Sequence, residues 1–354
     1  MRKQRKCFVI PASLLLSAVL FSTCASTPSS GGSQARQRQP EWINTPYVMY
    51  DEHQYIVRTG SGKSQVEAEK SALANLVGYF GLSISDDLRI STAYFEAVKN
   101  GVTDAWSDTT NIDRTIVTSA SLDSLVGAEI RENWFDGRDT HHAAAVMEKA
   151  KTAQIYYSLT EANLEMIKNL TNMNPAQKNT IEGFARYQFA AIVADINLSY
   201  GNVLRVIGVA PPGELKRGDE YRLEAMEITR LIPVGITVRN DRSGRIQGAF
   251  SKALSELGFS SGGVNSRYVL AVDITSTPVT IQNNANNFTR IEVTANFTDT
   301  STRAVLVPYT FNRREGHTSQ AEADNRAYSA AERIINEEYR DILSDYLSQL
   351  LPRR

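Results

Sequence analysis

The spacing of apolar residues predicts strands and helices in alternation through the first half of the chain. Gln54–Thr59 and Leu125–Phe135 have strand composition, and a further apolar run, Thr140–Met147, follows the second after a turn. Gly60–Ser64 is expected to form the turn after the first strand. A helical period begins at Gln65, and another begins at Glu148. The apolar positions are Ala68, Ala72, Leu73, Leu76, Val77 and Phe80 in the first helix, and Ala150, Ala153, Tyr157, Leu164, Ile167 and Leu170 in the second.

The middle of the chain predicts a helical hairpin. Asn172–Pro175 interrupts the second helix and is typical of a cap with proline at the start of the next. The following helix has its apolar stripe at Ile181, Phe184, Ala185, Phe189, Ile192, Val193 and Ile196. Two successive amphipathic helices should pack antiparallel, with the stripe buried inside the protein. Pro211–Gly213 and Lys216–Asp219 are then expected to form a loop, in which the Arg-Gly-Asp triplet at 217–219 is a chance occurrence.

The last third of the chain predicts an α+β unit. Leu231–Arg239 is rich in β-formers, Asp241–Gly244 precedes a helix, and Gly258 is placed to end that helix. Alternating residues then predict three strands around Tyr268–Thr275, Ile291–Phe297 and Val305–Phe311, followed by a helix over Gln320–Leu350. Because proline cannot donate to a ladder, Pro308 predicts that its strand lies at an edge. The whole chain is therefore expected to be α+β, with two small mixed or antiparallel sheets, each with helices packed on one face, joined by a helical hairpin.

The amino terminus has the pattern of an export signal. Met1–Lys6 is basic, Phe8–Phe21 is apolar, and small residues lead to Cys24, as in bacterial lipoprotein signals. The expected organisation is a signal peptide over 1–23, acylation of Cys24, and a polar tether over 24–40. Thr23 stands where Ala, Gly or Ser is usual, so an ordinary cleaved signal with an incidental cysteine is the alternative.

Composition narrows the possible chemistry. The chain has two cysteines, of which Cys7 lies in the signal and Cys24 would carry lipid, so the mature protein would keep no thiol for disulfides, nucleophilic catalysis or thiolate metal sites. Removing the four basic residues Arg2, Lys3, Arg5 and Lys6 from 38 leaves 34 against 39 acidic residues, a net charge near −5. That balance gives no reason to expect a nucleic-acid partner.

Two short motifs invite a chemical interpretation. Gly60–Ser64 resembles the end of a phosphate-binding loop, but Val57 occupies the position where the first glycine is needed, so no nucleotide partner is expected and Ser64 is interpreted as a helix cap. His141 and His142 are adjacent in a predicted strand and should point to opposite faces. We therefore expect no catalytic residue, cofactor or metal site, although an envelope hydrolase using His141 or His142 stays open as an alternative.

The order of elements also carries resemblances to known families. Pro40–Trp42, Tyr55–Gly62 with the alanine-rich helix after it, Gly127–Trp134 and Ala143–Ala150 resemble the LPP-twenty family of outer-membrane lipoproteins, and the amino-terminal domain of the flagellar assembly protein T is similar. This resemblance implies a small α+β domain in the cell envelope and brings no catalytic residues; His141 and His142 depart from it, since the family tends to have aromatic residues there. The carboxy-terminal unit is similar in order to the amino-terminal domain of TolB and to envelope lipoproteins that activate penicillin-binding proteins or secrete curli. That similarity implies contacts with other proteins.

These observations favour a non-enzymatic, lipid-anchored outer-membrane lipoprotein that acts by binding envelope proteins, facing the periplasm or displayed on the surface. The expected domains after the tether are 41–172, 173–210 for the second helix of the hairpin with its linker, and 211–354. An accessory of flagellar or peptidoglycan assembly is one alternative, and a module that binds a small molecule or lipid is another. The edge strand at Val305–Phe311 is the first expected partner surface.

Overall fold

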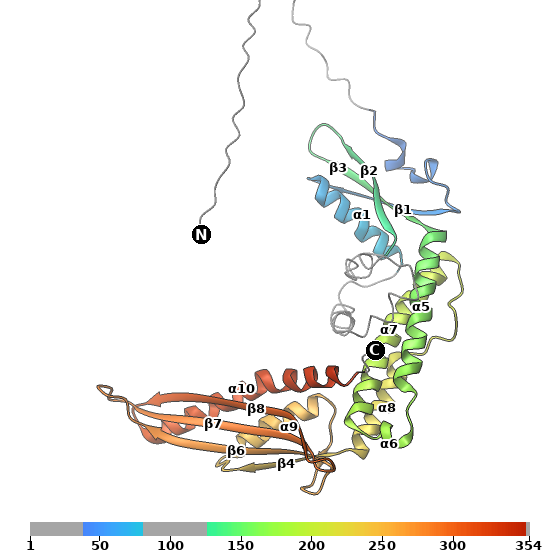
Figure 1. The fold of residues 1–354 in the computed structure, drawn as a ribbon. Coiled ribbons are helices and arrows are strands. Elements are labelled where there is room, and N and C mark those ends of the chain that lie inside the picture. The colour runs from blue at the N-terminus through green and yellow to red at the C-terminus, as the bar shows by residue number, and fades with distance from the viewer. Residues whose placement is uncertain (1–37, 81–125, 352–354) are drawn as a thin grey trace, which may run out of the picture. The chain divides into compact units, whose positions relative to one another are not determined.

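The computed structural model describes residues 38–80 and 126–351. The predicted signal peptide, Cys24 and all but the last residues of the predicted tether lie outside the described residues. Contacts group Gln39–Arg354 into one unit, which contains two β-sheets that are separated along the chain by a set of helices (Figure 1). Sheets and helices occur together in each half, which confirms the predicted α+β class.

The amino-terminal sheet has three antiparallel strands. They are β1 (Tyr55–Gly62), β2 (Ala128–Phe135) and β3 (His141–Glu148), in the order β1-β3-β2, and each was predicted from the sequence. The helix α1 (Gln65–Tyr79) follows β1 and begins where predicted, because the Ser64 side chain accepts a hydrogen bond from the Glu67 backbone N–H. Two short 3-10 helices, η1 (Glu41–Ile43) and η2 (Pro46–Val48), precede the sheet.

Both faces of the central strand β3 are covered. Ala143, Ala145 and Met147 belong to a cluster with α1, whereas Ala144 and Val146 pack with Trp42 of η1. The side chains of Ala143 to Met147 are each at most 1% exposed. The unbroken apolar run of this strand is therefore the pattern of a strand buried on both faces.

The prediction that Gly60 and Gly62 form a turn is wrong, because β1 continues through both residues. Their role is close packing against α1. A Cβ on Gly60 would lie 2.1 Å from the backbone N of Ala72, and one on Gly62 would lie 2.7 Å from the backbone N of Ala68. The two glycines thus allow the helix to lie directly on the strand.

Four helices follow the first sheet: α5 (Lys149–Thr171), α6 (Pro175–Lys178), α7 (Ile181–Ile207) and α8 (Gly218–Leu231). The predicted hairpin is formed by α5 and α7, since Leu170 packs with Phe189 while Tyr156 packs with Leu204. Asn174 caps the single turn α6, with Pro175 at its first position, and Thr180 caps α7. Helix α7 contributes to both sheet clusters, through Val203 and Leu204 in one and Ile181 and Phe184 in the other.

The face of α5 that is buried differs from the predicted stripe. Ala150 and Tyr157 are exposed, whereas Thr152, Thr160 and Asn163 are fully buried. The Asn197 side chain on α7 donates to the carbonyl oxygen of Thr160 at 3.2 Å, and the Thr160 hydroxyl donates to the carbonyl oxygen of Tyr156. Apolar spacing missed this face because part of the α5–α7 contact is polar.

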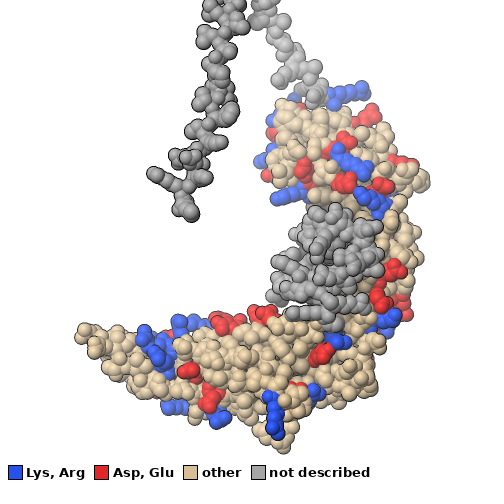
Figure 2. All heavy atoms as spheres, viewed as in Figure 1, with Lys and Arg blue, Asp and Glu red and all other residues tan. Residues whose placement is uncertain are grey.

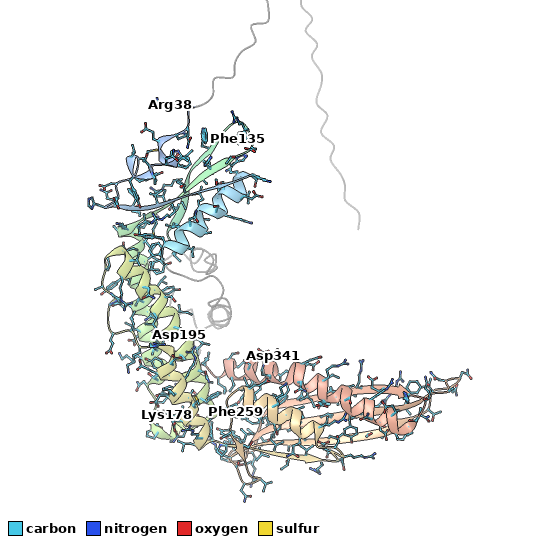
Figure 3. The ribbon with its side chains drawn as sticks, turned by 180° about the vertical axis from the view of Figure 1, so that it is seen from behind. Arg38, Phe135, Lys178, Asp195, Phe259 and Asp341 are labelled. Carbon is cyan, nitrogen blue, oxygen red and sulfur yellow. The ribbon has the colours of Figure 1, made fainter. Side chains whose placement is uncertain are left out.

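The predicted loop at Lys216–Asp219 is wrong from Gly218 onward, where α8 begins. Asp195 on α7 accepts hydrogen bonds from the Gly218 backbone N–H and from the Arg222 side chain, and so holds the first turn of α8 (Figure 3 labels Asp195). A Cβ at position 218 would lie 2.4 Å from the Asp195 carboxylate and 2.5 Å from the carbonyl oxygen of Ala191. The glycine of the Arg-Gly-Asp triplet therefore serves a helix–helix contact.

The carboxy-terminal sheet is mixed and has five strands in the order β5-β4-β6-β7-β8. Strand β4 (Val234–Arg239) runs parallel to the short β5 (Ser261–Gly262), which was not predicted, and to β6 (Tyr268–Val279). Strands β7 (Asn287–Asp299) and β8 (Ala304–His317) complete the sheet in antiparallel order. Pro308 lies in the edge strand β8, as predicted.

Two helices pack on one face of this sheet. They are α9 (Arg245–Glu256) and α10 (Gln320–Gln349), close to the predicted bounds. The alternate residues of β6 and β7 that were predicted as apolar all lie in the core with Phe250 of α9 and Tyr339 of α10, whose rings meet edge to face at 4.7 Å. Gly258 has φ +88° just after α9, in the left-handed region that glycine favours, which agrees with its predicted role as the end of that helix.

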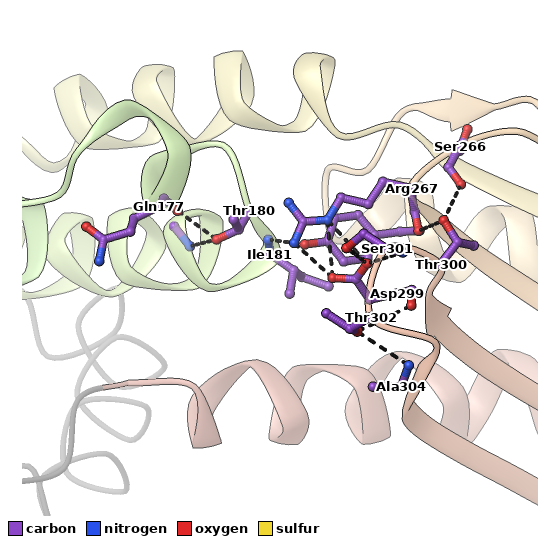
Figure 4. A network of polar contacts seen from close by, with 12 residues as sticks. Gln177, Thr180, Ile181, Ser266, Arg267, Asp299, Thr300, Ser301, Thr302 and Ala304 are labelled. Carbon is purple, nitrogen blue, oxygen red and sulfur yellow. Dashed lines mark hydrogen bonds and ion pairs between the residues drawn. The ribbon is translucent and has the colours of Figure 1, made fainter.

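A network of polar contacts fixes the turn between β7 and β8 (Figure 4). The Arg267 guanidinium donates to both carboxylate oxygens of Asp299, at 2.9–3.3 Å, and the Ser301 backbone N–H and hydroxyl also donate to this carboxylate. Burial alone would raise the pKa of Asp299, but these donors outweigh it, so the pKa lies below its usual value. Beside this network, the backbone N–H of Ile181, at the start of α7, donates to the Tyr268 hydroxyl at 3.2 Å.

Among the described residues, α7 alone is long and apolar enough to meet a composition test for a membrane span. Half of the tested window is buried in the protein, and the helix packs against α5 and α8. We interpret α7 as a core helix, in line with the buried stripe predicted from its sequence.

Candidate functional site

The adjacent histidines do not form one site. His142 lies opposite Trp134 in the ladder and His141 lies opposite Phe135, with ring centroids 5.4 Å and 4.5 Å apart (Figure 3 labels Phe135). Each imidazole thus faces an aromatic ring of β2, on its own face of the sheet. Within residues 38–80 and 126–351, no three His, Cys, Asp or Glu side chains are grouped closely enough to hold a metal ion.

A concave pocket lies where α7 meets the carboxy-terminal ends of α9 and α10. Its volume is about 330 Å³. The floor and walls are apolar side chains from the three helices and from the residues just after α9 and α10. They are Phe184, Ala185, Phe189, Ile192, Leu257, Leu347 and Leu351.

Polar side chains at this pocket complete its lining. They are Gln188, Glu256, Ser344 and Ser348. The Ser348 hydroxyl donates to the carbonyl oxygen of Asp345, and Glu256 lies 3.9 Å from the Lys252 ammonium group. An apolar cleft with a few polar groups is the usual form of a small-molecule site. No local pattern predicts this pocket, because its walls come from helices more than 50 residues apart in the chain, around positions 188, 256 and 347.

A second candidate site is the edge of β8, which among the described strands pairs with β7 alone. Residues 304–312 contain no charged side chain, and Val305 is 53% exposed, whereas Arg313, Arg314 and Glu315 follow directly. Uncharged residues also make up most of the visible surface of the carboxy-terminal sheet in Figure 2. Since charged residues on an edge strand discourage pairing with another chain, the uncharged half of β8 is the half that can accept a further strand. This half contains the predicted partner surface, Val305–Phe311.

No family model and no curated protein matches the sequence. Among solved structures, a secreted protein from Helicobacter pylori is similar over 80% of this chain and 98% of its own, with 14% identity and a TM-score of 0.39. A minor lipoprotein from Acinetobacter baumannii is similar over 35% of this chain and 96% of its own, with 16% identity and a TM-score of 0.25. A lipoprotein from Neisseria meningitidis is similar over 29% of this chain and 99% of its own, with 12% identity and a TM-score of 0.20. Secreted proteins and lipoproteins thus occur among the structural matches, and at these TM-scores the likeness adds no argument about function.

Proposed function

We propose that the chain is a lipid-anchored protein of the bacterial cell envelope that acts by binding other envelope proteins and catalyses no reaction. The observation that carries the binding role is the uncharged, free edge of β8 over residues 304–312. An extended segment of a partner can add to such an edge through main-chain hydrogen bonds. The Cys24 anchor rests on the sequence of the export signal.

The finer form of this proposal places the protein on the outer membrane as a member of the LPP-twenty family. A role as an accessory of flagellar or peptidoglycan assembly belongs to the same proposal. These statements are supported by the sequence resemblances of the two sheet units and by Ala25. In some bacteria, an aspartate directly after the lipidated cysteine keeps a lipoprotein in the inner membrane, and this chain has alanine at that position.

The experiment compares the full chain with a Cys24→Ala variant in a diderm bacterium. Cells are labelled with a palmitate analogue and cross-linked in place, and their membranes are then fractionated. We expect label, outer-membrane residence and cross-linked envelope proteins for the natural chain, and loss of label and membrane residence for the variant. A natural chain that is unlabelled and soluble would contradict the anchor, and an anchored chain that forms no cross-linked species would contradict the binding role.

The pocket favours a second candidate function, the binding of a small apolar molecule. A cavity of about 330 Å³ is within the range of known ligand sites, which begin at about 300 Å³. This function is compatible with the first, because the pocket and the β8 edge are formed by different residues.

A further inference from the structure

We propose that the pocket between α7, α9 and α10 binds a single-chain amphiphile whose polar end is uncharged or cationic. This inference rests on the second candidate function, and it adds the chemical class of the ligand. The shape, the unused hydrogen-bonding groups and the charge of the pocket each support one part of that description.

The size of the pocket limits the apolar part of the ligand. A volume of about 330 Å³ has room for roughly ten non-hydrogen atoms, if each takes about the 30 Å³ of a liquid water molecule. Phe184, Phe189 and Leu351 are each at most 6% exposed, so the apolar lining of the pocket is continuous with the protein core. One aliphatic chain of about this length fits the pocket, whereas two chains side by side exceed its volume.

The polar groups of the pocket indicate where the ligand's polar end lies. Among the described residues, the half-buried Gln188 and the exposed Ser344 have no hydrogen-bond partner for their side chains in the protein. Gln188 comes from α7 and Ser344 from α10, so these unused groups lie on both walls. An amide and a hydroxyl can together donate to and accept from a hydroxyl, ester or amine.

The charge at the pocket determines which polar end of a ligand is favoured. Among the described residues of the lining, Glu256 is the one charged side chain, and it is 43% exposed. Lys252, which is outside the lining, lies 3.9 Å from Glu256 and offsets part of its charge. A carboxylate or phosphate placed here would meet the Glu256 charge, whereas an ammonium group would be attracted to it. Fatty acids and anionic lipids are therefore disfavoured ligands.

The test uses three probes with the same ten-carbon chain: decylammonium, decanol and decanoate, each kept below the concentration at which it aggregates or separates from water. The protein is the purified full chain carrying Cys24→Ala, with affinity measured by calorimetry and location by methyl NMR of Leu257 and Leu347. We expect decylammonium and decanol to bind and to shift both leucine signals. Decanoate should bind about threefold or more weakly, because its carboxylate is repelled by the half-exposed charge of Glu256. The Glu256→Gln variant should remove that preference.

Filling the pocket should abolish binding. Ala185→Leu from α7 and Ser344→Leu from α10 each add carbon atoms inside the lining, and each should weaken decanol binding about tenfold or more. Ala321→Leu, at an exposed position of α10 outside the lining, is the matched control and should leave binding unchanged. Ser344 is exposed, so its variant should fold normally even if Ala185→Leu does not.

Three results would overturn the inference: no probe binds the natural pocket, decanoate binds as tightly as decylammonium, or binding is unaffected by Ser344→Leu. None of these results bears on the anchor or on the β8 edge, so failure of this inference is distinguishable from failure of the envelope-binding function.

Discussion

The two sheets of the protein bury their strands in different ways. In the amino-terminal sheet, α1 covers one face and Trp42 lies against the other, so the central strand β3 has no exposed side chain from Ala143 to Met147. In the carboxy-terminal sheet, α9 and α10 cover one face, and exposed residues such as Ala271, Asp273 and Thr275 alternate with buried ones along β6. The burial patterns differ accordingly, because burial is continuous from Ala143 to Met147 in β3 and alternates from Tyr268 to Thr275 in β6. Both sheets have edge strands, but among the described residues the second sheet also has an exposed face.

The largest expected effect comes from placing lysine at successive positions in each sheet. Val146→Lys and Met147→Lys in β3 should both destabilise the fold by about 4 kcal/mol or more, since each buries an unpaired charge. In β6, Ile274→Lys should have a similar effect, whereas Thr275→Lys should stay within about 0.5 kcal/mol. Denaturant unfolding of the four variants measures these values. Tolerance of either β3 substitution would contradict the burial of both faces.

Removing the second layer of the amino-terminal sheet should have the next largest effect. Trp42→Ala would uncover Val57 and Val146 and should lower the free energy of unfolding by about 3–5 kcal/mol. Val269→Ala, on the open face of the carboxy-terminal sheet, serves as the comparison and should cost less than about 1 kcal/mol. Thermal unfolding followed by circular dichroism distinguishes the two, and equal small losses would mean that Trp42 does not form a layer.

Two glycines should respond to alanine with opposite signs. Gly60→Ala places a Cβ against the backbone of α1 and should destabilise the protein by about 1–3 kcal/mol. Gly248, inside α9, has nothing within 4 Å of an added Cβ, so Gly248→Ala should stabilise the helix by up to about 1 kcal/mol. Denaturant midpoints of the two variants give the signs directly. A neutral Gly60→Ala would show that α1 can move away from β1.

A further effect concerns the aspartates that hold two of the hairpin turns, the one between β2 and β3 and the one between β7 and β8. Asp299, 6% exposed, receives donors from Arg267 and Ser301, whereas Asp136 receives backbone N–H donors from Arg138, Asp139 and Thr140 at the surface. Backbone hydrogen bonds from Arg138 and Thr140 lower the pKa of Asp136, and the pKa of Asp299 is lowered as well. A carboxyl group whose pKa is lowered on folding stabilises the folded state at pH values above its unfolded-state pKa of about 4. This contribution is lost as the pH falls through the pKa of the folded state.

Asp299→Asn should therefore cost about 1–2 kcal/mol at neutral pH, a value reduced by the partial exposure of Arg267. Asp136→Asn should cost less, because that carboxylate is at the surface. Urea unfolding between pH 3 and pH 7 provides the measurement. The difference between Asp299→Asn and the natural chain should shrink as the solution is acidified, and a difference that grows at low pH would contradict the sign of the shift.

Local patterns in the sequence predicted most of the elements, and contacts between elements account for the errors. The alternation at Tyr268–Thr275, the cap at Ser64 and the edge position of Pro308 were all correct, since each depends on neighbouring residues. Gly60 was misread as a turn because only the closeness of α1 explains it. Helix α8 was missed although its start has a local cap, in which the Glu220 side chain accepts from the Arg217 backbone N–H; the second contact at this start is with Asp195, which lies 23 residues before Gly218.

The two candidate sites also differ in whether local sequence patterns predict them. The β8 edge was predicted from Pro308 and its alternating neighbours, which are local signals. The pocket could not be predicted, because Gln188, Glu256 and Ser344 are brought together only by the packing of three helices. In the sequence alone, Phe184 and Phe189 belong to an ordinary core stripe, and nothing local shows that space remains beside them.

The binding role of the β8 edge is tested most directly by photo-cross-linking in cells. A photoreactive residue is placed at position 305 on the free edge of β8 and, in a matched protein, at position 275 on the open face of β6. The anchored protein should cross-link to a discrete envelope protein from position 305 and not from position 275, and the Pro substitution Thr310→Pro in the same strand should remove that product. Equal products from both positions, or none from position 305, would contradict the role of the β8 edge.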